Sequence, residues 1–199
     1  MRELRVGRVL VASLHQAIAD VLPDRLEFYE NWLSAAGLRE GTIGLAPLTA
    51  VLSFLRGEGD AYNQITARAG EYAADWTVSN ISAFERRVVR VLPVRLRTRV
   101  ALRTAGALVR STYPGSRAIV RVRRGVASVE LRGSLFCEVR EATVSPLCGF
   151  YAAAIARVLQ QFALRADGSV AACRAAGGRK GCLLRIEVAR AGANEPVAA

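Results

Sequence analysis

The hydrophobic period of the sequence changes once, near residue 113, and this change limits the possible folds more than any other feature. Before the stretch YPGS at 113–116, apolar residues recur at intervals of three and four, which is typical of amphipathic helices. After it, RAIVRVRRG at 117–125 and GVASVELRG at 125–133 alternate apolar and polar residues, as half-buried strands do. Gly125 is the turn residue between them, so we expect a hairpin. The chain is therefore predicted to begin with helices and to continue with an antiparallel sheet.

Four segments of the first half are predicted to be helical: 9–22, 24–38, 60–76 and 82–113. Pro23 ends the first segment, and Gly37 is a C-cap candidate for the second. An apolar block at 45–55 precedes the turn-like RGEGD, and Pro93 interrupts the last segment. The helical part of the chain is therefore expected to cover residues 1–113.

The second half contains further strand patterns and one long helix. GSLFCEVR at 133–140 is predicted to be a third strand, and Ser145 with Pro146 opens a helix predicted at 147–165. Two last strands are predicted at 169–175 and 182–188. The expected fold class is α+β, with the helical N-terminal half packed on an antiparallel sheet, in the order helices, three strands, helix, two strands.

We expect one domain. A length of 199 residues is enough to bury a core without disulfide bonds. The domain is predicted at 1–188, with the sheet-containing part at 117–188 and a flexible tail at 189–199. The longest apolar stretches contain Pro, Gly, Ser or Arg and are too short to cross a bilayer, so no membrane span is expected. The N-terminus lacks a signal-peptide cleavage site, and we interpret the chain as cytoplasmic.

The chain is strongly basic, with 28 Lys and Arg against 17 Asp and Glu and a net charge of +11. Such a surface can attract nucleic acid, an acidic protein or an anionic membrane. Basic density peaks at 86–110, where arginines alternate with Val, Leu and Ala. Aromatic residues for base stacking are absent there, so we interpret the segment as a solvated helix face and expect no nucleic acid partner.

The four cysteines are the residues of this sequence best suited to metal binding or redox chemistry. Without a signal peptide, metal binding, redox sensing or plain packing are favoured over disulfides. Cys148 falls in the first turn of the predicted helix, where the helix dipole favours thiolate, the form that binds zinc. Cys173 and Cys182 stand at the two ends of ACRAAGGRKGC, so a hairpin brings them together around the glycines at 177, 178 and 181.

The fourth cysteine, Cys137, is a candidate both for core packing and for a metal ligand. On its predicted strand it alternates with Leu135 and Val139, which indicates an inward and merely buried thiol. A metal site would take three sulfurs from the other cysteines and a fourth ligand from Cys137, a carboxylate or water. The alternative is that all four cysteines are small buried residues.

Residues 134–188 resemble the 4-vinyl reductase domain family, which is related to core subunits of the TRAPP vesicle-tethering complex and to sensor domains of aromatic-responsive bacterial activators. The similarity lies in PLCGFYAAAIARVL, in ACRAAG and in GCLLRIEV. The helical half, with AGLREGTIG and ITARAGEYAAD, is similar only loosely. The resemblance implies a mixed α/β domain, often dimeric, with a hydrophobic pocket between helices and sheet.

The resemblance also implies a structural zinc ion held by Cys148, Cys173 and Cys182. The aromatic-sensing branch has a glutamate ligand three residues before the cysteine that matches Cys173, whereas this chain has Val170 there. Cys137, Asp167 or water would then complete the site.

Nothing in the sequence indicates catalysis. The family is named for a proposed vinyl-group reduction in bacteriochlorophyll synthesis, but the chain has no GxGxxG after a strand and no recognisable flavin motif. His15, the sole histidine, is interpreted as a surface or packing residue. We therefore expect the protein not to be an enzyme.

Three functions remain as hypotheses. The first is binding of an apolar, aromatic or tetrapyrrole-like molecule, with zinc as a structural cofactor. Its pocket would be lined by Phe54, Tyr72, Trp76, Phe84, Phe150 and Tyr151, although such aromatic residues also pack ordinary cores. The second is a TRAPP-like scaffold that forms a homodimer or offers 86–110 to an acidic partner protein. The third is an accessory role in chlorophyll-type tetrapyrrole metabolism.

Overall fold

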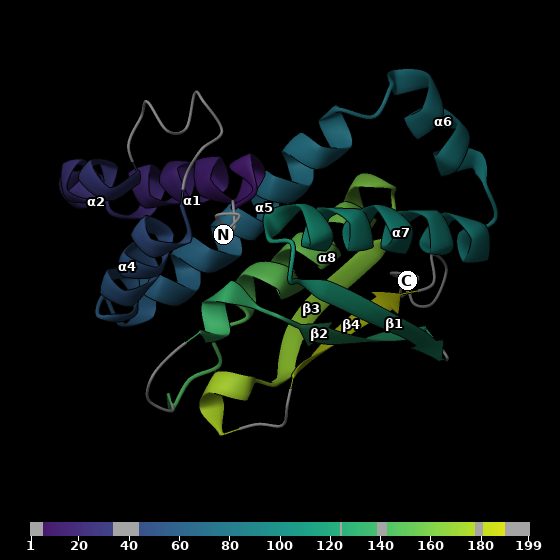
Figure 1. Cartoon of the computed structure of the whole chain (residues 1–199). Coiled ribbons are helices and arrows are strands. Elements are labelled where there is room, and N and C mark those ends of the chain that lie inside the picture. The colour runs from purple at the N-terminus through teal and green to yellow at the C-terminus, as the bar shows by residue number, and fades with distance from the viewer. Residues whose placement is uncertain (1–5, 34–43, 124, 139–142, 178–180, 190–199) are drawn as a thin grey trace, which may run out of the picture.

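The computed structural model describes residues 6–33, 44–123, 125–138, 143–177 and 181–189 (Figure 1). The predicted C-cap Gly37, the loop residues Gly178 and Lys180, and positions 190–199 of the predicted tail lie outside the described residues. The first half is helical, as predicted. Its elements are α1 (Arg8–Val21), the 3-10 helix η1 (Pro23–Arg25), α2 (Leu26–Leu33), α4 (Leu45–Arg56), α5 (Asp60–Ser79), α6 (Ala83–Val91) and α7 (Val94–Thr112).

The second half builds one four-stranded sheet. Its strands are β1 (Arg117–Arg123), β2 (Val126–Arg132), β3 (Arg165–Ala172) and β4 (Cys182–Ala189), with helix α8 (Gly149–Gln161) before β3. The strand order is β1-β2-β4-β3, and each neighbouring pair is antiparallel. Gly125 turns between β1 and β2 with a φ of 83°, which few other residues adopt. The α+β class and the first hairpin are confirmed.

The predicted third strand at 133–140 is wrong in its described part. Leu135–Cys137 form a 3-10 helix, η2, and all three side chains are buried. A strand would turn Phe136 away from the core, because side chains alternate between the faces of a sheet. The compact turn buries consecutive residues instead. The observed order is therefore helices, two strands, helix, two strands.

The predicted helix at 147–165 is also too long. Helix α8 ends at Gln161, and Ala163 has a φ of 55°, which a helix does not allow. The following strand therefore begins at Arg165, earlier than the predicted position 169. Its exposed and half-buried residues alternate, as expected for a strand with one face toward the helices.

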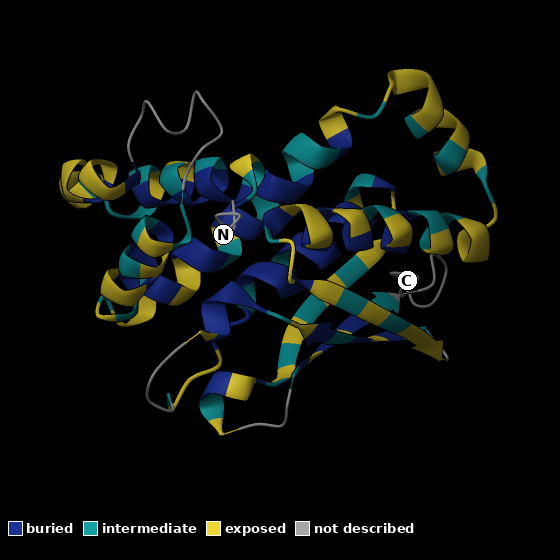
Figure 2. Cartoon of the chain, in the orientation of Figure 1, coloured by how far each residue is buried: buried dark blue, intermediate teal, exposed yellow. Residues whose placement is uncertain are grey.

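The helices cover one face of the sheet. Helix α8 packs against β3 and β4, and α7 packs against β1 (Figure 1). The side chains that β2 turns toward the helices, Ala127, Val129 and Leu131, are buried. The opposite face of the sheet is largely exposed (Figure 2). No helix within the described residues is both long and apolar enough to cross a membrane.

Helix α5 lies close against α8 because Gly70 has no side chain. A Cβ atom at this position would lie 2.3 Å from the carbonyl oxygen of Phe150. Farther along the same pair of helices, the guanidinium of Arg157 donates two hydrogen bonds to Asp75, at 2.7 and 3.0 Å. These contacts hold the N-terminal half of the chain against the helix that carries Cys148 at its start.

Candidate metal centre and ligand groove

The four cysteines come from four segments that meet at one end of the sheet. Cys137 is the last residue of η2, and Cys148 is the N-cap residue of α8. Cys173 follows β3 directly, and Cys182 is the first residue of β4. All four side chains are buried. The four cysteines therefore bring together the 3-10 turn after β2, the connection between β3 and β4, and the start of α8.

The spacing of the sulfur atoms suits a tetrahedral metal ion. All four Sγ atoms lie within 4.8 Å of one another. Cys148 lies 3.0 Å from Cys137 and from Cys182, and the remaining Sγ to Sγ distances run from 3.3 to 4.0 Å. In a tetrahedral site with Zn–S bonds of about 2.3 Å, the sulfurs are about 3.8 Å apart. The four cysteines could therefore hold one metal ion after small adjustments.

Backbone amides point at two of the sulfurs. The amide of Leu147 donates to Sγ of Cys173, and the amide of Arg174 donates to Sγ of Cys182, each at 3.3 Å. Such donors stabilise a thiolate more than a neutral thiol. Hydrogen bonds from the thiols of Cys137 and Cys148 also hold the pKa of Cys173 below its ordinary value. These donors therefore favour negative charge on the sulfurs of Cys173 and Cys182, as a metal ligand requires. Hydrogen bonds with the neighbouring cysteines and burial raise the pKa of Cys148, so its thiol stays protonated until a metal ion displaces the proton.

The structure brings the three predicted cysteine ligands together and adds Cys137 as the fourth sulfur. Asp167, the carboxylate named as an alternative fourth ligand, is exposed on β3 opposite Glu187. It does not belong to the group of residues that could share one metal ion. The role of Cys137 was hard to predict because it depended on the strand assignment. A buried apolar run such as LFC is compatible with either a strand or a tight turn.

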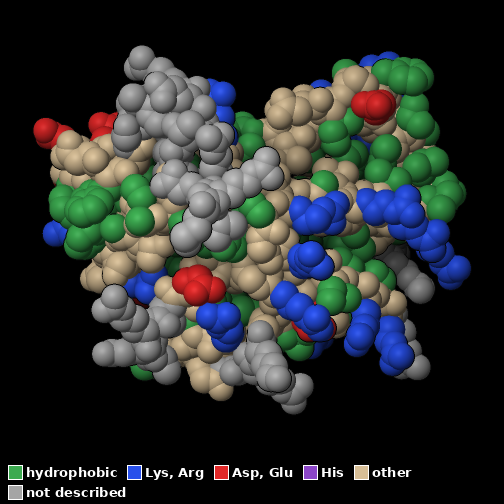
Figure 3. All heavy atoms as spheres, viewed as in Figure 1, with side chains coloured by type: hydrophobic (Ala, Val, Ile, Leu, Met, Phe, Trp, Pro, Cys, Tyr) green, Lys and Arg blue, Asp and Glu red, His purple; other side chains and the backbone are tan. Residues whose placement is uncertain are grey.

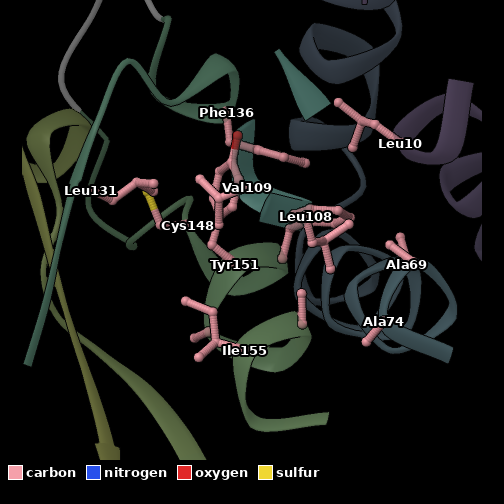
Figure 4. Close-up of a cluster of buried hydrophobic side chains, with 14 of the residues drawn as sticks. Leu10, Ala69, Ala74, Leu108, Val109, Leu131, Phe136, Cys148, Tyr151 and Ile155 are labelled. Atoms are coloured by element: carbon pink, nitrogen blue, oxygen red, sulfur yellow. The ribbon is translucent and has the colours of Figure 1, made fainter. Parts of the chain in front are cut away.

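An aromatic cluster packs beside the cysteines. Phe136 stacks on Phe150 with ring centroids 5.1 Å apart, and Tyr151 meets both rings edge-on. The hydroxyl of Tyr151 lies 3.3 Å from that of Ser116 and 3.4 Å from that of Thr112, and burial raises its pKa to about 12. Figure 4 shows Phe136, Cys148 and Tyr151 within the buried core between the helices and the sheet.

The six aromatic residues predicted to line a pocket lie in four separate places. Phe150 and Tyr151 are fully buried beside the cysteines, and Tyr72 stacks on Trp76 along α5. Phe54 contacts two aromatic side chains of α2, and Phe84 is 76% exposed on α6. His15, expected at the surface or in packing, lies 2.7 Å from Glu30 in an exposed pair.

A groove of about 980 Å³ lies between α7 and the helix-covered face of the sheet. The sequence did not predict a pocket here, although the four arginines that line the groove belong to the basic segment 86–110. None of the six aromatic residues lines it. One wall is α7, which contributes the arginines, and the floor is β1 with the end of β4. Basic side chains gather over this part of the molecule (Figure 3). The lining residues are Val94, Arg95, Thr98, Arg99, Leu102, Arg103, Gly106, Arg110, Ala118, Val120, Val122, Gly125 and Val188.

Comparison with known proteins leaves the family open. The chain matches no known family model, and no curated protein is similar to it. Among solved structures, it is similar to trafficking protein particle complex subunit 3 from Naegleria fowleri, solved with covalently bound palmitic acid. The two share 12% sequence identity over 82% of this chain and 93% of the other, with a TM-score of 0.47. The resemblance to the 4-vinyl reductase domain family therefore stays a prediction.

Proposed function

We propose that this chain is a non-catalytic binding and assembly domain whose four cysteines hold one structural zinc ion. The observation that carries this proposal is the buried group of four Sγ atoms with mutual distances of 3.0 to 4.0 Å. Four thiolates fill a tetrahedral zinc site and leave no position for a substrate, whereas catalytic zinc sites keep one open. Zinc at this point would tie η2, α8 and the β3-β4 connection together.

Metal analysis tests the proposal directly. Protein purified without metal affinity resin is expected to contain about one zinc ion per chain by mass spectrometry, as a single four-ligand site requires. Cys137→Ser and Cys173→Ser should each lower the zinc content and the melting temperature. Gly70→Ala serves as a control, because it disturbs the contact between α5 and α8 without replacing a ligand. Four thiols that titrate freely in metal-free folded protein would contradict the zinc centre.

An assembly role is supported by helix α6, whose apolar stripe faces away from the molecule. Phe84 and Val91 are 76% and 79% exposed, and Val88 lies between them on the same stripe. Val89, on another side of the helix, packs against the core instead. Exposed apolar stripes of this kind mark interaction sites. We propose that α6 contacts a second copy or a partner protein, as the scaffold hypothesis requires.

Sedimentation velocity distinguishes a homodimer formed through α6 from a monomer that binds a different protein. Phe84→Ser with Val91→Ser should convert a homodimer to a monomer, whereas Val144→Ser, which changes an exposed apolar residue elsewhere, should not. If the protein is a monomer from the outset, pull-down of an acidic partner should weaken in Arg87→Glu with Arg95→Glu. A monomer whose recovered partners are unaffected by either pair of substitutions would exclude the α6 interface.

Binding of a small molecule is the second candidate function, and the groove between α7 and β1 favours it. Its volume of about 980 Å³ is large enough for a small organic ligand. The site differs from the predicted aromatic pocket, because its apolar surface comes from Val, Leu and Ala side chains. Saturable binding of an apolar fluorescent probe to the zinc-containing protein would support this role.

A further inference from the structure

We propose that the groove between α7 and β1 binds an amphiphilic anion, a small molecule with an apolar body and one or more carboxylate, sulfonate or phosphate groups along one edge. This inference rests on the small-molecule candidate above and names the chemical class of its ligand. It follows from three properties of the groove: an incompletely covered floor, a row of arginines on one wall, and the absence of acidic residues from the lining.

The floor of the groove is apolar and only partly covered. Ala118, Val120 and Val122 alternate along β1 and face the helix side of the sheet. Val129, paired with Val120 on the neighbouring strand, is fully buried, whereas Val122 is 50% exposed. Figure 1 shows the reason: α7 and β1 meet near residues 113–116 and diverge from there. An apolar ligand would cover the part of this apolar floor that α7 leaves exposed.

The wall of the groove carries a regular row of positive charge. Arg95, Arg99 and Arg103 follow each other at four-residue spacing on α7, so they lie along one side of the helix over about 12 Å. Arg110 continues the basic lining nearer the end of α7. The guanidinium fork suits carboxylate, sulfonate and phosphate groups because it donates parallel hydrogen bonds.

These arginines have no acidic neighbours in the groove. No Asp or Glu occurs among its lining residues, and within the described parts of the chain none of the four arginines forms an ion pair. In contrast, Arg157 and Arg25 pair with carboxylates elsewhere. Positive charges crowded on one wall repel each other, and an anionic ligand would relieve that repulsion.

The same features argue against larger occupants. A second copy that docked face to face through the same groove would place one arginine row against another, which is electrostatically unfavourable. A single-stranded nucleic acid needs aromatic side chains for stacking, and the groove lining has none. A small molecule whose apolar part reaches Val120 and whose anionic part reaches Arg99 satisfies both surfaces at once.

Two fluorescent probes with the same aromatic body test the proposal. 8-Anilinonaphthalene-1-sulfonate is anionic, and N-phenyl-1-naphthylamine is its neutral counterpart. With the folded, zinc-containing protein we expect saturable binding of the anionic probe at about one site per chain and a Kd at least about tenfold below that of the neutral probe. The anionic probe should also lose affinity as salt concentration rises.

Substitutions locate the site. Arg99→Ala with Arg103→Ala should weaken the anionic probe about tenfold or more and leave the neutral probe nearly unchanged. Val120→Asp should weaken both probes, because it places a carboxylate on the apolar floor. Arg121→Ala is the matched control, since Arg121 precedes Val122 on the same strand but points to the opposite face. It should change neither affinity.

Three outcomes would overturn the inference. They are non-saturable binding of the anionic probe, equal affinity for the two probes, or an affinity that the paired Arg99 and Arg103 substitutions leave intact. Each protein is checked for zinc content and for a cooperative thermal transition, so that probe binding to partly unfolded chains is recognised. Failure of probe binding in folded, zinc-containing protein would refute the groove site alone, whereas loss of zinc would bear on the metal centre.

Discussion

The Sγ atoms of Cys137 and Cys182 lie 3.3 Å apart in the core, although 45 residues separate them along the chain. The contact joins the 3-10 turn after β2 to the first residue of β4. Strand β2, which precedes this turn, also pairs with β4, and Leu131 lies opposite Cys182. A metal ion between the sulfurs would therefore reinforce a connection that strand pairing has already made.

Removal of the metal should lower stability strongly. Chelation, or Cys148→Ser at the start of α8, leaves buried thiols without their common partner. We expect a loss of about 3 kcal/mol or more in the free energy of unfolding, a magnitude expected for breaking a buried charged cluster. In a chain of this size this corresponds to a fall in melting temperature of about 6 to 12 °C. Differential scanning calorimetry with and without added zinc measures it, and an unchanged transition would contradict a structural metal.

Two helical glycines should respond in opposite directions to substitution by alanine. Gly70→Ala is expected to destabilise the protein by about 1 to 3 kcal/mol, because its Cβ would meet the backbone of Phe150 at 2.3 Å. Gly106→Ala meets only the end of the Arg110 side chain at 3.6 Å. It should be neutral or stabilising by up to about 1 kcal/mol, since alanine favours helix. Urea denaturation compares the two, and equal effects would contradict the close approach of α5 and α8.

Stability should decrease at alkaline pH. Burial raises the pKa of Tyr151 from 10.0 to about 12, and burial also raises the pKa values of Tyr29 and Tyr62. A group with a raised pKa in the folded state stabilises the fold fully below its unfolded pKa, and this contribution is lost as the pH rises. For Tyr151 the loss should begin near pH 10 and be complete near pH 12.

Tyrosinate absorbance measures this effect. During an alkaline titration, these buried tyrosines should ionise together with loss of the circular dichroism signal, at higher pH than tyrosine in unfolded chain. In Tyr151→Phe the pH midpoint of unfolding should move to higher pH, because one of the buried tyrosines whose ionisation favours the unfolded chain is removed. Ionisation of all five tyrosines near pH 10 in a still-folded chain would contradict the burial of Tyr29, Tyr62 and Tyr151.

The N-cap of α6 should stabilise this helix against local unfolding and have little effect on the stability of the whole domain. The Ser82 side chain accepts a hydrogen bond from the amide of Glu85, and the Glu85 carboxylate accepts one from the amide of Ser82. Ser82→Ala should cost about 1 kcal/mol within this helix. Because α6 has no buried residue, we expect faster amide exchange at 83–91 with a nearly unchanged melting temperature. A large fall in melting temperature would indicate that α6 is integrated into the core.

The local features of the sequence determined the order and type of most elements. The helical period before residue 113, the break at Pro93 and the turn at Gly125 depend on the backbone preferences of neighbouring residues, so they could be predicted from the chain alone. The hairpin that brings Cys173 near Cys182 could be predicted in the same way, because its strands are adjacent in sequence.

The tertiary structure decided the rest. The fourth sulfur, Cys137, depended on whether Leu135 and Phe136 form a strand or a turn, and packing selected the turn that buries both. The aromatic residues expected in one pocket lie in separate places, Phe150 and Tyr151 in the core and Phe84 at the surface, because residue type does not specify which helix faces meet. The groove exists only because α7 and β1 diverge, and the angle between packed elements is set by contacts between residues far apart in the chain.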